Sequence, residues 1–104
     1  MKLITLFLTC AHQQEAETIA RDLLSKKLVA CVKQTPVNSM FTWQHKIDSA
    51  TEILLIMDSI EDKFSAIEQV VKKLHSYETF VLIAHPITHA SAGVEAWIKS
   101  SLKE

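Results

Sequence analysis

A chain of 104 residues, 48% hydrophobic and 22% charged, fits one folded domain over residues 1–104 and is too apolar for a disordered protein. Its eleven basic and twelve acidic residues leave a net charge of -1, which excludes the basic surface typical of proteins that bind nucleic acid or anionic membranes. No stretch approaches the ~20 apolar residues that span a bilayer, and two cysteines predict reduced thiols in the cytoplasm instead of a disulfide framework.

Alternating apolar residues from Ile4 to Cys10 predict a first strand. The same run imitates a secretory signal, but no small-x-small cleavage site follows it, which favours the strand. Apolar residues at helical spacing then predict an amphipathic helix with Glu15 and Glu17 on its polar face. The helix should end near Lys26, because cations suit a helix C-terminus.

Residues 28–32, "LVACV", read as a buried second strand, which "VNSMFTW" extends beyond a kink or bulge at Pro36. The turn is expected at residues 44–46, and residues 47–57 form the returning strand. Glycine is absent from this turn, so His45 should adopt strained or altered geometry there.

Ser59 stands three residues before Asp62, a spacing that predicts a capping box at the start of a second helix. A fourth strand is expected over residues 79–87, followed by a closing helix around Trp97. The order strand, helix, strand, strand, helix, strand, helix predicts an α+β fold. It is the ferredoxin-like split β-α-β arrangement, βαββαβ plus a C-terminal helix, with an antiparallel sheet and a long central β-hairpin.

The predicted hairpin is too long for its own core. A strand of ~13 residues spans about 40 Å, whereas a domain of this size has a radius of gyration near 13 Å. Its far end carries the apolar residues Met40, Phe41, Trp43 and Ile47, which helices on the body cannot reach. The overhang predicts a homo-oligomer; the alternative is a hairpin that folds back at Pro36.

Several short segments of the sequence resemble the CutA family of divalent-cation tolerance proteins. They are "KKLVACV", "SMFTW", "EILLIMDS", "LHSYE", "AHPI" and "AWIKSSL", and the similarity runs from about residue 8 to residue 102. The resemblance implies a tight trimer joined through the hairpin, like the PII signalling proteins, with no enzymatic reaction and a role in tolerance of copper and other divalent metals. It also implies a cleft between subunits lined by Trp43, His75, Tyr77 and Glu78.

The chain departs from the family pattern at this cleft. Asp58 stands where a lysine is usual, and Phe80 and Val81 stand where a proline and a glutamate are usual. We therefore keep three possibilities open. The chain is a metal-ion response protein, or a PII-like sensor or scaffold that binds an anion or metabolite and partner proteins, or a trimer that has lost the cleft function of the family. Asp58 beside His75 and Glu78 would favour a cation.

The candidate metal ligands are Cys31 and His75. A thiolate at Cys31 would select Cu(I), although its apolar neighbours also fit a buried structural cysteine. His75 follows a helix end, where it could ligate a metal or cap the helix.

Other apparent motifs are set aside on geometry. Pro86 forbids the helix that would bring His85 and His89 together, and a returning strand should separate Cys10 from Cys31. The chain also lacks a G-x-S-x-G elbow and, with one glycine, any phosphate-binding loop, so no catalytic residues are predicted.

Overall fold

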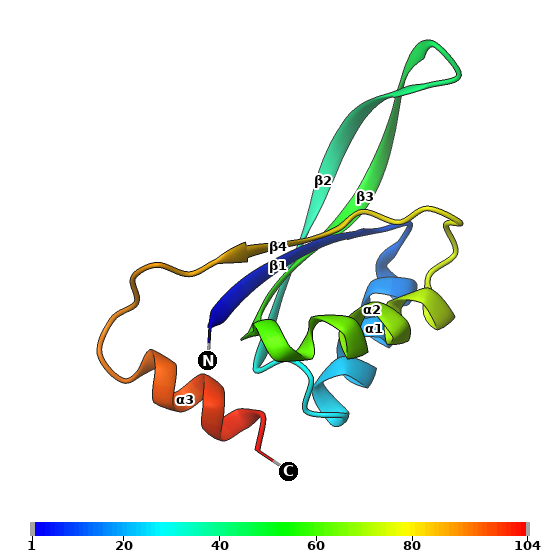
Figure 1. The fold of residues 1–104 in the computed structure, drawn as a ribbon. Coiled ribbons are helices and arrows are strands. Elements are labelled where there is room, and N and C mark those ends of the chain that lie inside the picture. The colour runs from blue at the N-terminus through cyan, green and yellow to red at the C-terminus, as the bar shows by residue number, and fades with distance from the viewer. Residues whose placement is uncertain (1, 104) are drawn as a thin grey trace.

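The computed structural model describes residues 2–103 and confirms the predicted α+β fold (Figure 1). Its elements, in chain order, are β1 (Leu3–Cys10), α1 (Gln13–Ser25), β2 (Cys31–Trp43), β3 (Lys46–Ile60), the short 3₁₀ turn η1 (Glu61–Lys63), α2 (Phe64–Leu74), β4 (Leu82–Pro86) and α3 (Val94–Ser101). None of the helices within residues 2–103 is long and apolar enough to cross a membrane.

The four strands form one antiparallel sheet in the order β2-β3-β1-β4, and α1 and α2 cover one of its faces (Figure 1). Alternation along the central strand β1 directs Leu6, Leu8 and Cys10 into the core, where all three are fully buried. The helices complete this core with the buried residues Ile19 and Leu23 of α1 and Ile67 and Val71 of α2. β3 lies between β1 and β2, so Cys10 and Cys31 are separated and free, as predicted.

The pairing of β2 with β3 is unbroken from Cys31, opposite Asp58, to Trp43, opposite Lys46. Pro36 pairs with Ile53 and no residue is inserted beside it, so the expected bulge is wrong. β2 is an edge strand, where a proline is tolerated because its missing N–H can face away from the sheet.

The hairpin projects from the body as predicted (Figure 1). The last residue pair between β1 and β3 is Cys10 with Ile53, so beyond that point β2 and β3 pair only with each other. The molecule is accordingly elongated, with extents of 44 × 26 × 21 Å. The tip leaves Met40, Trp43 and Ile47 62–78% exposed, and the alternative of a hairpin folded back on the body is wrong.

Two parts of the sequence-based prediction need correction. Ser59 belongs to the end of β3, which pairs with β1 as far as Ile60, and its buried hydroxyl donates to the carbonyl oxygen of Leu28 at 2.6 Å. It therefore cannot cap α2, which starts at Phe64 after η1 and has no side-chain cap. Strand β4 is shorter than expected, because only residues 82–86 pair with β1.

The two-residue turn of the hairpin has positive φ at both residues, 50° at Gln44 and 65° at His45. This is the pattern of a type I′ turn, which favours Asn-Gly because other side chains strain there. The altered geometry expected for His45 is confirmed.

Replacing His45 by glycine is expected to stabilise the protein by about 1 kcal/mol, because glycine carries no Cβ penalty at positive φ. The midpoint of urea unfolding should rise while its slope stays constant. Ser49→Gly is the matched control: it places glycine inside the adjacent strand and should lower the midpoint. A lower midpoint for His45→Gly would contradict the strain argument.

Candidate functional site

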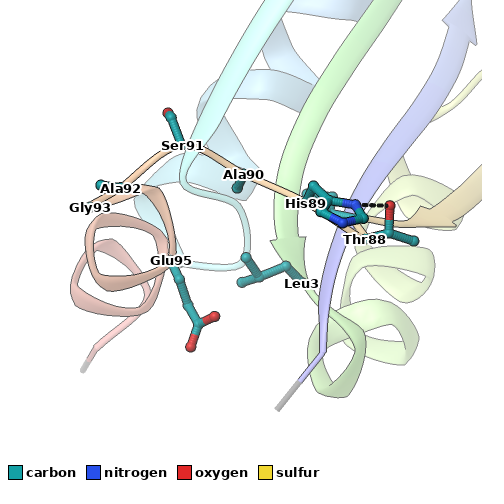
Figure 2. Close-up of a pocket in the computed structure, with 9 residues that line it drawn as sticks. Leu3, Thr88, His89, Ala90, Ser91, Ala92, Gly93 and Glu95 are labelled. Carbon is teal, nitrogen blue, oxygen red and sulfur yellow. Dashed lines mark hydrogen bonds between the residues drawn. The ribbon is translucent and has the colours of Figure 1, made fainter.

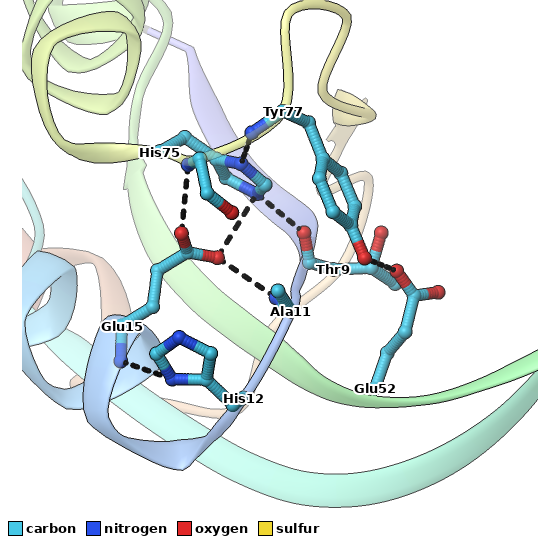
Figure 3. A network of polar contacts seen from close by, with 8 residues as sticks. Thr9, Ala11, His12, Glu15, Glu52, His75 and Tyr77 are labelled. Atoms are coloured by element: carbon cyan, nitrogen blue, oxygen red, sulfur yellow. Dashed lines mark hydrogen bonds and ion pairs between the residues drawn. The ribbon is translucent and has the colours of Figure 1, made fainter.

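His75 is the C-cap of α2, and its side chain is fully buried. The ring does not bind the last carbonyls of its own helix. Its Nε2 instead lies 2.8 Å from the carbonyl oxygen of Thr9 at the end of β1, and its Nδ1 accepts the N–H of Tyr77 at 3.0 Å (Figure 3). The helix end is thereby pinned to the central strand.

Glu15 is the unexpected neighbour of His75. Its carboxylate oxygen Oε2 lies 3.8 Å from His75 Nε2 and accepts the N–H of Ala11, while Oε1 accepts the N–H of Ser76 (Figure 3). The side chain is 6% exposed, so its place on the polar face of α1 was misjudged. Burial raises the pKa of Glu15, but the hydrogen bonds from Ser76 and Ala11 outweigh it, with help from His75, and leave the pKa below its ordinary value.

Cys10, the last residue of β1, is buried beside Glu15 and His75 and is the third member of this cluster. Burial, together with the carboxylates of Glu15 and Glu52, raises the pKa of this thiol to about 12. One ligand atom each from Cys10, Glu15 and His75 lies within 4.8 Å of the other two. Across residues 2–103 this is the one trio of potential metal-ligating side chains that gathers so closely.

The trio has the donor chemistry of a transition-metal site. Thiolate, imidazole and carboxylate are the three ligand types of zinc, and ligand atoms in a tetrahedral zinc site lie roughly 3.3–3.8 Å apart. His75 Nε2 and Glu15 Oε2 already meet that separation at 3.8 Å. The cluster needs to contract by about 1 Å at most, and three protein ligands would leave a fourth position open.

Tyr77 extends the cluster toward the hairpin. Its hydroxyl donates to Oε2 of the buried Glu52 at 2.7 Å (Figure 3), and burial followed by this bond raises the pKa of Tyr77 to about 12. The ring of His75 contacts two aromatic rings: its centroid lies 4.8 Å from that of Tyr77 and 5.5 Å from that of Phe80, which is stacked on it. Phe80 thus packs directly on the candidate ligand.

The structure brings His75 and Tyr77 together but keeps other predicted site residues apart within one subunit. Cys31 pairs with Asp58, which pairs with Thr5 and accepts a hydrogen bond from its hydroxyl. Thr5 precedes the Thr9 carbonyl by four residues of strand, about 13 Å. Cys31 and His75 therefore cannot ligate one ion within a subunit.

The remaining cleft residues face outward. Trp43 lies at the hairpin tip, Glu78 is exposed, and Val81 is 54% exposed. Glu78 directly follows Tyr77 in the chain, whereas Trp43 belongs to the projecting tip of the hairpin.

A hollow of ≈ 270 Å³ lies elsewhere, at the opposite end of β1 (Figure 2). It is lined by Leu3, by the loop that includes His89, and by Glu95 of α3. This volume is below the roughly 300–1,000 Å³ of small-molecule sites. His85 packs against Phe7 and His89 contacts Thr88, so the two histidines do not form one site.

Sequence comparison shows what this chain is similar to. The family model described as "CutA1 divalent ion tolerance protein" matches residues 4–101. The divalent-cation tolerance protein CutA of Archaeoglobus fulgidus is 38% identical over 98 residues, which cover 94% of this chain and 96% of that protein. The CutA homolog of Xenopus laevis is 32% identical over 99 residues, covering 94% of this chain and 66% of its own length.

Solved structures show the same fold. The crystal structure of CutA1 from Oryza sativa superposes with a TM-score of 0.95 at 30% identity and covers all of this chain and 96% of its own. The structure described as the periplasmic divalent cation tolerance protein CutA from Archaeoglobus fulgidus gives 0.94 at 37% identity, covering 97% and 99%. The chain spans about half the length of its mouse and human relatives.

Proposed function

The chain belongs to the CutA1 divalent ion tolerance family, and we propose that it serves metal tolerance by binding a metal ion at Cys10, Glu15 and His75. The observation that carries this proposal is the convergence of a thiol, a carboxylate and an imidazole within 4.8 Å inside the protein. No catalytic role is proposed.

Two ions fit the donor set. Zn(II) accepts sulfur, nitrogen and oxygen in a tetrahedral site, and a thiolate with an imidazole suits Cu(I). Binding either ion requires the thiolate form of Cys10, whose pKa burial raises to about 12, so loading releases a proton. Affinity should therefore increase with pH.

We further propose a homotrimer joined through the hairpin, with a cleft between subunits. The support is the apolar tip, which carries Met40 and Ile47 at 78% exposure and has nothing to pack against within residues 2–103. Trp43, Asp58 and Glu78 stay candidates for lining that cleft, and Cys31 stays a candidate metal ligand outside the cluster.

A cytoplasmic location stays a prediction. Its support is the pair of free thiols, Cys10 and Cys31, which suits a reducing compartment. The Archaeoglobus fulgidus structure is described as periplasmic, so fractionation of the native cells is the deciding measurement.

Titration of the purified protein with Zn(II) and with Cu(I), each in competition with a coloured chelator, tests the site. We expect one saturable ion per subunit, and a loss of at least 100-fold in affinity in Cys10→Ser, because a hydroxyl replaces the thiolate ligand. Circular dichroism should show that the variant remains folded.

Cys31→Ser is the matched control, since it makes the same atomic change in a free cysteine outside the cluster. It should bind both ions as the unaltered protein does. If Cys31→Ser loses affinity and Cys10→Ser keeps it, the ion is held at Cys31 instead. If the unaltered protein binds neither ion saturably, the metal proposal fails.

A further inference from the structure

Every polar atom of the His75 ring is already in use. Nδ1 accepts the N–H of Tyr77 at 3.0 Å, so Nδ1 carries the lone pair and Nε2 carries the proton. Nε2 then donates that proton to the Thr9 carbonyl oxygen at 2.8 Å (Figure 3). The ring has no free lone pair to offer a metal in this arrangement.

Ligation breaks the same hydrogen bond whichever ring nitrogen is used. If Nδ1 binds the ion, its lone pair is no longer available to Tyr77 N–H. If Nε2 binds the ion, the proton of the neutral ring moves to Nδ1, which then faces Tyr77 N–H as a second donor. The backbone amide of Tyr77 loses its acceptor in both cases.

Glu15 behaves differently. Two carboxylate oxygens provide about four lone-pair sites, and at most three are occupied, by the N–H groups of Ser76 and Ala11 and by the side chain of Ser76. The carboxylate can therefore bind an ion and keep both backbone hydrogen bonds. The amide of Ser76 stays held while its neighbour at Tyr77 is released.

Tyr77 links this change to the hairpin. Its hydroxyl donates a hydrogen bond to Glu52. Glu52 directly precedes Ile53, the β3 residue of the last β1–β3 pair, and so lies where the hairpin leaves the body. Val37 lies opposite Glu52 on β2. Within residues 2–103, Tyr77 is the hydrogen-bonded side chain that joins the cluster to the root of the hairpin.

From these contacts, and resting on the proposed metal function, we propose that an ion at the cluster releases Tyr77 and weakens its bond to Glu52. Metal binding would then loosen a contact at the root of the hairpin. Tyr77 would act as a positioning residue that holds His75 in its metal-free orientation. The coupling is reciprocal, because a contact that metal binding weakens must itself oppose metal binding.

Amide hydrogen exchange followed by NMR, with and without Zn(II), tests the release directly. We expect the Tyr77 amide to exchange at least about tenfold faster in the zinc-loaded protein, since its hydrogen bond is lost. The adjacent Ser76 amide should keep its rate and so serves as an internal control.

Zinc binding by the Tyr77→Phe variant provides a second test of the coupling. The substitution removes the hydroxyl that holds Glu52 while keeping the ring, so zinc should bind on the order of two- to tenfold more tightly. If the Tyr77 side chain instead oriented His75 for ligation, its replacement would weaken zinc binding.

The outcomes separate this inference from the proposed function. Saturable zinc binding with a protected Tyr77 amide, or with unchanged or weaker binding by Tyr77→Phe, would overturn the coupling and leave the metal site standing. Absence of zinc binding would overturn both.

Discussion

Replacing Met40 and Ile47 by aspartate is expected to convert the proposed homotrimer into monomers. The two side chains lie on one face of the hairpin, because Met40 pairs with Ser49 and Thr42 pairs with Ile47. Both are 78% exposed in the single subunit, and burying a large apolar side chain contributes about 1.5–3 kcal/mol. Charges there would forfeit that burial and add the cost of desolvating carboxylates in every subunit.

Sedimentation velocity at micromolar concentration measures the outcome as a change from a trimer mass to 11.7 kDa. The control variant is Gln14→Asp with Gln69→Asp, which places two acids on exposed positions of α1 and α2. It should keep the mass of the unaltered protein. Trimers in the Met40→Asp, Ile47→Asp variant, or monomers in the unaltered protein, would contradict the hairpin interface.

Glu15→Ala is expected to destabilise the protein by about 2–4 kcal/mol. It leaves the N–H groups of Ala11 and Ser76 without their acceptor and removes the carboxylate beside His75. Each unpaired buried donor costs about 1–3 kcal/mol, somewhat less here because both amides are only partly buried. Urea unfolding of the metal-free protein measures the loss, and the same variant should bind Zn(II) poorly.

The contribution of Glu15 to the free energy of unfolding should depend on pH. The pKa of Glu15 is lower in the folded protein than in the unfolded chain, so its ionised form contributes stability above the ordinary pKa of a glutamate. That contribution should disappear as the pH falls through the folded-state pKa. Glu15→Gln, which keeps an acceptor oxygen, should be milder than Glu15→Ala and lose the acid-dependent part. Equal stability of all three proteins at neutral pH would contradict the role assigned to Glu15.

Those elements of the fold that depend on local patterns could be predicted from the sequence. Period-two and helical spacing located the first strand, both main helices and the long hairpin, and the missing glycine indicated the unusual turn at His45. The prediction that Ser59 caps α2 was wrong because the same short sequence pattern fits a helix cap and the end of a strand. Only its pairing partner Ile4, 55 positions earlier, fixes it in β3.

The candidate site was only half predictable for the same reason. His75 was identified from its place after a helix, but its partners Cys10 and Glu15 come from the other end of the chain. The helical pattern of the sequence assigns Glu15 to the polar face of α1. It cannot show that the end of α2 covers the first turn of α1 and buries this side chain. The hydrogen bond from Ser76 to Glu15, 61 residues apart, is visible only in three dimensions.

The projecting hairpin also bears on what a stability measurement means for this protein. Beyond Ile53 its two strands hold only each other, and an isolated two-stranded hairpin is marginal in water. If neighbouring subunits supply the missing contacts, the hairpin is ordered by association, and part of the unfolding free energy belongs to the assembly. The melting temperature should then fall on dilution, while a protein that completes its fold within one chain melts at the same temperature at every concentration.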